Sequence, residues 1–280
     1  MAMSAAKNFC RKFTDSHPLP RIITTLTQLI NDEKSTIKDF EEVIKVDPVL
    51  VSRLLKLVNS VYFAPVQPVD SVGRAVALLG IKNLHNLVIT DALKTFFDAP
   101  EKDTVFSKRQ LWVHSAAVSI CSKMVAERIF AINGDDALLC GILHDFGLLI
   151  EDQVEQKKFR DICNTCTSTE SLLEMEQQSF GTDHSEISYT MTLDWNLSPT
   201  IQEALRDHHL IADNILPSSL TGIIQIAEYI VGKMEYPVLP RIEVIISPQL
   251  VEHIHDNIEE YNVLTDDLPE EIATAQSIFG

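Results

Sequence analysis

The sequence has no excess of basic residues. Its 280 residues include 23 Lys and Arg against 40 Asp and Glu, which gives a formal net charge of −17. Proteins that bind duplex nucleic acid or an anionic membrane present a basic face, so we expect neither partner. Phosphorylated substrates stay open, because a bound metal ion can reverse the local sign of charge.

Cysteines and long apolar runs are also scarce. Five cysteines, an odd number, are scattered through apolar helical segments, which does not resemble a disulfide framework. The first 21 residues lack the apolar segment of a signal peptide. No apolar run approaches the roughly 20 residues of a membrane span. We therefore expect a soluble, cytoplasmic protein in a reducing environment.

Alternating strand patterns, internal repeats and low-complexity tracts are absent as well, and nearly every segment has helical periodicity. Asp47 and Pro48 form a cap-plus-proline helix start, and Gly80 is typical of a helix end. Thr167 and Glu170 have the spacing of a capping box. With 45% hydrophobic residues, the chain can bury a substantial core. These features predict an all-α fold, a multi-helix bundle of two packed helical subregions that meet near residues 97–107.

Residues 140–150, CGILHDFGLLI, place His144 and Asp145 inside a run that is otherwise apolar or glycine. Burying a carboxylate without a partner is costly. No Lys or Arg lies within a helical turn of Asp145 that could neutralise it. The small residues Gly141 and Gly147 flank the doublet and leave room for a close neighbour.

Five further residues lie on apolar helical faces or at helix ends: His114, His184, His208, His209 and Glu228. A lone buried histidine is usually a hydrogen-bonded core residue, and a lone glutamate can lie at the edge of a helix. The joint occurrence of these groups with the doublet favours a shared divalent cation. Imidazoles mixed with carboxylates, without cysteine, suit Fe, Mn, Co, Ni or Zn better than Ca or Mg.

The order His114, His144-Asp145 and a distant carboxylate resembles the H…HD…D pattern of the HD phosphohydrolase superfamily, with Glu228 in place of the family's Asp. Residues 47–88 resemble the signature of the HDOD domain more specifically. They contain the Asp-Pro helix start, Asn59-Ser60 followed by Tyr62-Phe63, and the Pro68…Ser71 loop. The resemblance covers about residues 17–235. It divides the chain into an N-terminal arm (1–16), an HDOD domain (17–235, with halves 17–100 and 104–235) and an acidic helical extension (236–280, with helices near 248–261 and 267–278).

The resemblance implies an all-α signalling module related to the HD-GYP cyclic-dinucleotide phosphodiesterases. It also implies a site for one or two metal ions. One ion would be held by His114, His144, Asp145 and Glu228. A second would be held by His184, His208 and His209, with Asp145 as the bridge.

Two departures from the HD-GYP pattern weaken the case for catalysis. Leu148 stands where that family has a phosphate-binding Lys, and the GYP segment after the histidine pair is absent. Two functions therefore remain open. The first is a regulatory module that binds partner signalling proteins and retains the metal site. The second is a metal-dependent phosphohydrolase acting on a nucleotide or cyclic dinucleotide, with Asp145 and His144 as its catalytic residues.

A few other residues are interpreted as structural. Cys163 and Cys166 have CxxC spacing but no second pair nearby, so a redox or zinc role is disfavoured. His85 matches no ligand position. We also expect core positions for Trp112 and Trp195, and exposed positions for His253 and His255.

Overall fold

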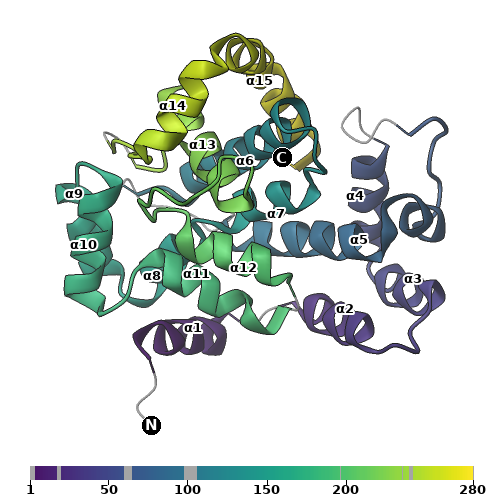
Figure 1. Ribbon diagram of the computed structural model, residues 1–280. Coiled ribbons are helices and arrows are strands. Elements are labelled where there is room, and N and C mark those ends of the chain that lie inside the picture. Colours follow the sequence, from purple (N-terminus) through teal and green to yellow (C-terminus); the bar gives the residue numbers. More distant parts are fainter. Residues whose placement is uncertain are drawn as a thin grey trace. The chain divides into compact units, whose positions relative to one another are not determined.

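The computed structural model describes residues 4–17, 20–59, 65–97, 106–195, 197–234, 236–239 and 242–279 (Figure 1). Among these residues the one strand-like pairing is an isolated parallel bridge between Ser168 and Glu243. The all-α prediction is confirmed. The chain divides into two compact units, a smaller one of residues 19–96 with 273–280, and a larger one of residues 1–18 with 97–272.

The smaller unit is built from α2 (Arg21–Asn31), α3 (Ile37–Lys45), α4 (Pro48–Val58) and α5 (Val72–Phe97). As predicted, Asp47 caps α4, because its Oδ1 accepts hydrogen bonds from the backbone N–H groups of Val49 and Leu50 at 2.9 and 3.0 Å. Gly80 interrupts α5 with a φ of +79°, a conformation that favours glycine. The helix therefore stops at the expected glycine, although a second helical segment follows it directly.

Asn59 anchors the loop of the HDOD-like segment. Its Oδ1 accepts from the backbone N–H of Val69 at 2.6 Å, and its Nδ2 donates to the Val69 carbonyl at 2.7 Å. Val69 belongs to the buried core of this unit, together with Phe40, Ile44 and Leu54. One amide side chain thus fixes the end of the loop to the end of α4. His85 is also structural here, as expected, since it is buried within 3.1 Å of the Thr27 hydroxyl.

The larger unit contains the remaining helices (Figure 1): α1 (Ala5–Ser16), α6 (Lys108–Met124), α7 (Asp135–Leu143), α8 (Phe146–Val154), α9 (Gln156–Thr165), α10 (Thr169–Phe180), α11 (His184–Thr192), α12 (Pro199–Asp207), α13 (Leu220–Lys233), α14 (Pro248–Asp256) and most of α15 (Ile258–Phe279). A π-helical turn, Val125–Ile129, extends α6, and a 3₁₀ turn, Leu193–Trp195, follows α11. Helices α6, α7 and α13 pack together, α11 packs on α8 and α12, and α1 covers α8 and α11.

Two glycines permit the closest of these helix contacts. A Cβ added at Gly141 would lie 2.4 Å from the Ser119 Cα, where α7 crosses α6. A Cβ at Gly147 would lie 2.0 Å from the His184 carbonyl oxygen, where α8 meets the start of α11. Real side chains do not approach backbone this closely, so both positions require glycine. The glycines beside the His-Asp doublet therefore do leave room for neighbours, as the sequence indicated.

Two helix boundaries differ from the expected ones. The capping box of α10 is formed by Ser168 and Ser171, not by Thr167 and Glu170. The reason is that the Thr167 carbonyl accepts from the backbone N–H of Glu243 at 3.2 Å, which holds Thr167 in an extended bridge before the helix begins.

The last helix is also longer than expected, because α15 begins at Ile258 and not near residue 267. Pro269 lies inside α15. The buried stripe of Tyr261, Leu264 and Leu268 has helical spacing and binds the earlier turns to the core.

Candidate metal centre

The candidate site lies within the larger unit, and helix ends supply most of its side chains. His144 and His208 are the C-cap residues of α7 and α12, Asp145 is the N-cap of α8, and His184 opens α11. A helix end lets a side chain reach past the backbone of its own helix toward its neighbours. Two more side chains come from helix interiors, His114 on α6 and Glu228 on α13, and His209 follows α12 directly.

Asp145 is the centre of the cluster. Its Oδ2 lies 3.5 Å from Nε2 of His114 and 3.2 Å from Nε2 of His144. Its Oδ1 lies 3.5 Å from Nε2 of His184 and 3.6 Å from Nε2 of His208. Each carboxylate oxygen therefore faces its own pair of imidazoles.

Backbone carbonyls fix the orientation of three of these rings. Nδ1 of His114 donates to the Tyr236 carbonyl at 2.6 Å, Nδ1 of His144 to the Gly141 carbonyl at 2.8 Å and Nδ1 of His208 to the Leu205 carbonyl at 2.8 Å. A carbonyl only accepts, so Nδ1 carries the hydrogen, and in a neutral ring Nε2 presents a lone pair. The carbonyls thus turn three lone pairs toward the Asp145 carboxylate.

Lone pairs that face carboxylate oxygens need a cation between them. Six buried atoms of the predicted ligands have no hydrogen-bond partner: Nε2 of His114, His144 and His208, Oδ1 and Oδ2 of Asp145, and Oε2 of Glu228. Orphaned polar atoms are rare in protein interiors and call for a water, a proton or an ion. Imidazole nitrogens and carboxylate oxygens are ligands of divalent transition metals. The residues present therefore fit the metal that the sequence predicts.

The donor atoms form two groups on either side of Asp145. His114, His144 and Glu228 bring one ligand atom each to within 4.8 Å of one another. Asp145, His184, His208 and His209 do the same. All seven predicted ligands are thus brought together in the predicted division, and their occupancy by one or two ions stays a prediction.

Burial and charge shift the pKa of each group. Burial lowers the pKa of His114 to about 4, and it lowers the pKa of His208 as well. Burial also acts to lower the pKa of His184, but the carboxylates of Glu176 and Asp145 outweigh it and raise the pKa to about 9. Burial raises the pKa of Glu228 to about 8. Without a cation, the cluster therefore favours protons on His184 in one donor group and on Glu228 in the other.

A residue outside the predicted set supports His184. Glu176 on α10 is fully buried, and its Oε2 accepts from Nδ1 of His184 at 2.8 Å and from the His184 backbone N–H at 3.1 Å. A carboxylate behind a ligating histidine fixes the ring and raises its basicity. Glu176 continues the buried stripe of Thr169 and Leu172, and this helical spacing is the signal that could have identified it.

A second buried carboxyl group lies behind Glu176. Glu151 on α8 is fully buried within hydrogen-bond reach of Glu176, and burial with the neighbouring Glu176 charge raises the pKa of Glu151 well above its ordinary value. The raised pKa favours the protonated form of Glu151, which can donate to Glu176. Leu148, one turn before it, is also fully buried, so the position that carries Lys in HD-GYP enzymes is apolar core here.

One pocket of about 410 Å³ reaches the cluster at His209. The side chain of His209 is 6% exposed, whereas those of the other six predicted ligands are at most 2% exposed. The other residues that line the pocket are Thr169, Glu170, Leu173, Glu174, Ile211 and Ile245.

The remaining sequence expectations have simple outcomes. All five cysteines are free, and burial raises the pKa of the Cys163 thiol, so this thiol is unreactive at neutral pH. Trp195 is buried, whereas Trp112 is half-buried. The expectation for His253 was wrong, because it is half-buried against the Phe130 ring. Within the described residues no helix is long and apolar enough to cross a membrane.

Comparison with known proteins identifies the family. The family model described as HDOD domain matches residues 17–211. The chain therefore belongs to the HDOD domain family, as the resemblance of residues 47–88 indicated.

Individual relatives are distant. An uncharacterized protein of Treponema pallidum (strain Nichols) is 24% identical over 212 residues, which is 73% of this chain but 39% of that protein. The chain thus spans about two fifths of that relative. Among solved structures, an HDOD domain protein of unknown function from Geobacter sulfurreducens is 22% identical, with a TM-score of 0.62 over 93% of this chain and 97% of that one. A protein from Shewanella amazonensis SB2B, provisionally named a metal-dependent phosphohydrolase, is 16% identical, with a TM-score of 0.65 over 99% and 100% of the two chains. At these identities the structures establish the shared helical fold.

Proposed function

We propose that this chain is an HDOD-type signal transduction module whose His/Asp cluster holds one or two divalent transition metal ions, Fe, Mn, Co, Ni or Zn. The observation that supports this most directly is the set of imidazole lone pairs and unpaired carboxylate oxygens around Asp145. The ions would join side chains from α6, α7, α8, α11, α12 and α13. A ligand that binds only the folded state stabilises it. The metal would therefore raise the stability of the larger unit.

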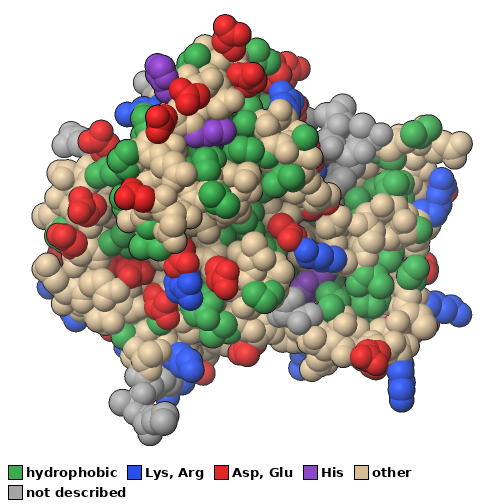
Figure 2. Space-filling model, in the orientation of Figure 1, with side chains coloured by type: hydrophobic (Ala, Val, Ile, Leu, Met, Phe, Trp, Pro, Cys, Tyr) green, Lys and Arg blue, Asp and Glu red, His purple; other side chains and the backbone are tan. Residues whose placement is uncertain are grey.

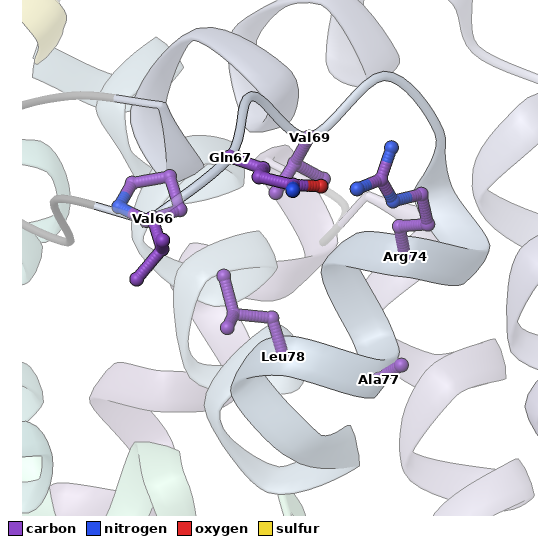
Figure 3. Close-up of a pocket in the computed structure, with 7 residues that line it drawn as sticks. Val66, Gln67, Val69, Arg74, Ala77 and Leu78 are labelled. Carbon is purple, nitrogen blue, oxygen red and sulfur yellow. The ribbon is translucent and has the colours of Figure 1, made fainter.

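We also propose that the module acts by binding partner signalling proteins. An open hollow of about 430 Å³ lies in the smaller unit, between the loop after Pro65 and the first turns of α5 (Figure 3). Val66 and Leu78 line it and are strongly exposed, and Arg74, the basic residue of its lining, pairs with Asp70 at 3.2 Å. Exposed apolar side chains gathered at a hollow are typical of protein-binding surfaces.

The alternative is a metal-dependent phosphohydrolase acting on a nucleotide or cyclic dinucleotide. Asp145 favours it, because one carboxylate faces two donor groups, as in two-metal hydrolytic sites. A bound metal would lower the pKa of a coordinated water. Asp145 would bridge the two metals, and His144 would act with it as the second catalytic residue.

The restricted access to the cluster favours the signalling module over the hydrolase. A phosphoryl group must touch the metals, yet six of the seven ligand side chains are at most 2% exposed. The pocket at the seventh, His209, is lined by Glu170 and Glu174 and by no Lys or Arg within the described residues. Two carboxylates repel an anionic substrate.

Elemental analysis combined with a phosphodiesterase assay separates the two functions. We expect purified protein to contain between one and two equivalents of transition metal, and to hydrolyse neither bis-p-nitrophenyl phosphate nor cyclic di-nucleotides above the rate of the Asp145→Asn variant. Turnover in the wild type that disappears in Asp145→Asn would establish the hydrolase instead.

A further inference from the structure

Six of the seven predicted ligand side chains are at most 2% exposed, and that of His209 is 6% exposed. His209 lines the pocket of about 410 Å³, and its side chain lies close to residues of both donor groups. Its Nε2 lies 3.1 Å from Nε2 of His184, and its Nδ1 lies 3.7 Å from Oε2 of Glu228. Oε2 of Glu228 is buried and has no hydrogen-bond partner. An ion bound to His209 could therefore exchange directly to His184 in one donor group or to Glu228 in the other.

The lining of this pocket attracts cations. Glu170 and Glu174 are exposed and lie one turn apart on α10, on the same side of the helix. The other walls of the pocket are apolar, formed by Leu173, Ile211 and Ile245, and they carry no charged group that would pair with Glu170 or Glu174. An ion in the pocket would meet two carboxylates at the surface and an imidazole at the base.

The charge of the whole unit acts in the same direction. Residues 19–96 hold nine of the 23 Lys and Arg residues and eight of the 40 Asp and Glu residues, and residues 273–280 hold none of either, so the larger unit carries a net charge of −18. Acidic side chains are spread over its visible face, on α14 and α15 among other elements (Figure 2). A field of this sign concentrates cations near the surface and raises their rate of association.

We propose that the pocket formed by Glu170, Glu174 and His209 is the uptake route through which a divalent metal ion reaches the buried cluster. Glu170 and Glu174 collect the hydrated ion, and His209 takes it as the first imidazole ligand and passes it to His184 or Glu228. This inference rests on the proposed metal centre and adds a kinetic role to Glu170 and Glu174, which are not predicted ligands, and to the ligand His209.

Uptake kinetics test the charge of the route. Chelator-treated full-length protein is mixed with Co²⁺ in a stopped-flow instrument, and its visible absorption reports binding. We expect Glu170→Gln/Glu174→Gln to bind Co²⁺ about tenfold more slowly than wild type at low ionic strength, with the difference shrinking as salt is added. The metal content at saturation should not change. The control is Asp266→Asn/Glu270→Gln, an exposed pair with the same spacing on α15, which should keep the wild-type rate.

A second variant tests the route without changing charge. Ile211→Trp narrows the pocket, so uptake of Co²⁺ and its release to a chelator should slow by the same factor, with the Kd unchanged. A change to a metal ligand would alter the Kd, whereas a change to the access route alters only the rates of uptake and release. If both pocket variants exchange Co²⁺ at wild-type rates, the uptake route is wrong although the metal centre stands. If the wild type binds no Co²⁺ at all, the metal centre and the route are both wrong.

Discussion

Nε2 of His114 lies 3.5 Å from Oδ2 of Asp145, and neither atom has a hydrogen-bond partner. The Tyr236 carbonyl holds the ring of His114 so that its lone pair faces the carboxylate. Two groups that repel each other in this way persist in a folded protein when something positive lies between them. This relationship is the physical core of the proposed metal centre, and its consequences can be measured.

Removing the carboxylate behind His184 should weaken the second donor group selectively. Glu176→Gln leaves the side-chain shape intact but removes the charge that orients and polarises the His184 ring. We expect metal affinity at the second group to fall by about 10- to 100-fold, while the affinity of the group around His114 stays near wild type. A two-site calorimetric titration measures both. Exposed Glu203→Gln is the control, and equal loss at both groups would contradict the assignment.

The stability of metal-free protein should fall as pH rises from about 6.5 to 9. The pKa of His184 is raised to about 9 in the folded protein, so its stabilisation is present below the ordinary value of 6.5 and is lost as pH passes through 9. The pKa of Glu228 is raised from 4.5 to about 8 in the folded protein, so stability also falls as pH rises from about 4.5 to 8, which overlaps the lower part of this interval. Thermal melts of chelated protein should therefore show a lower Tm at pH 9 than at pH 6.5.

Metal should remove most of this pH dependence, because it replaces the protons on these groups. Metal affinity should correspondingly rise over the same interval as protons are released. A chelated protein whose Tm is flat between pH 6.5 and 9 would contradict the charge states assigned to His184 and Glu228.

Gly147→Ala should disrupt the site through packing alone. The added methyl group would lie 2.0 Å from the His184 carbonyl oxygen, so α8 and α11 must move apart. We expect a loss of about 1–3 kcal/mol in the free energy of unfolding, with weaker metal binding at His184. Gly73→Ala is the matched control, since its new methyl group would meet only the flexible end of Glu41 at 3.2 Å. Denaturant unfolding that gives equal stability for both variants would show that the contact at Gly147 can relax.

Duplex DNA should not bind at physiological salt. The larger unit carries a net charge of −18, and phosphate affinity requires clustered basic contacts. Fluorescence anisotropy with a labelled duplex measures this directly. A salt-sensitive complex with a sub-micromolar Kd would contradict the prediction.

Much of this structure could be predicted from local sequence. Helical periodicity and the absence of alternating runs predict the all-α fold, and Asp47 and Gly80 mark helix boundaries because caps and left-handed glycines act within a few residues. His144 and Asp145 stand out because a charged group in an apolar run requires a partner. The seven candidate ligands could be named one by one on this basis.

What local sequence could not provide is set by contacts between distant segments. The start of α10 at Thr169 depends on a bridge to Glu243, and the burial of His253 depends on the ring of Phe130. Glu176 shares a helical stripe with Thr169 and Leu172, but its role as the partner of His184 depends on α11 beginning against it. The pairing of each Asp145 oxygen with its own two imidazoles is likewise a property of the packed helices.

The metal content of the purified protein, compared between wild type and the Asp145→Asn variant, tests the central claim most directly. Asn keeps the shape of the side chain but cannot act as an anionic bridge, and exposed Asp194→Asn provides the control. Mass-spectrometric elemental analysis should find one to two equivalents of transition metal in wild type and in the control, and less than a tenth of that in Asp145→Asn. Added metal should raise the Tm of the first two proteins only. Wild-type protein that holds no transition metal after incubation with Mn²⁺, Fe²⁺, Co²⁺, Ni²⁺ and Zn²⁺, or Asp145→Asn protein that holds as much as wild type, would contradict the account.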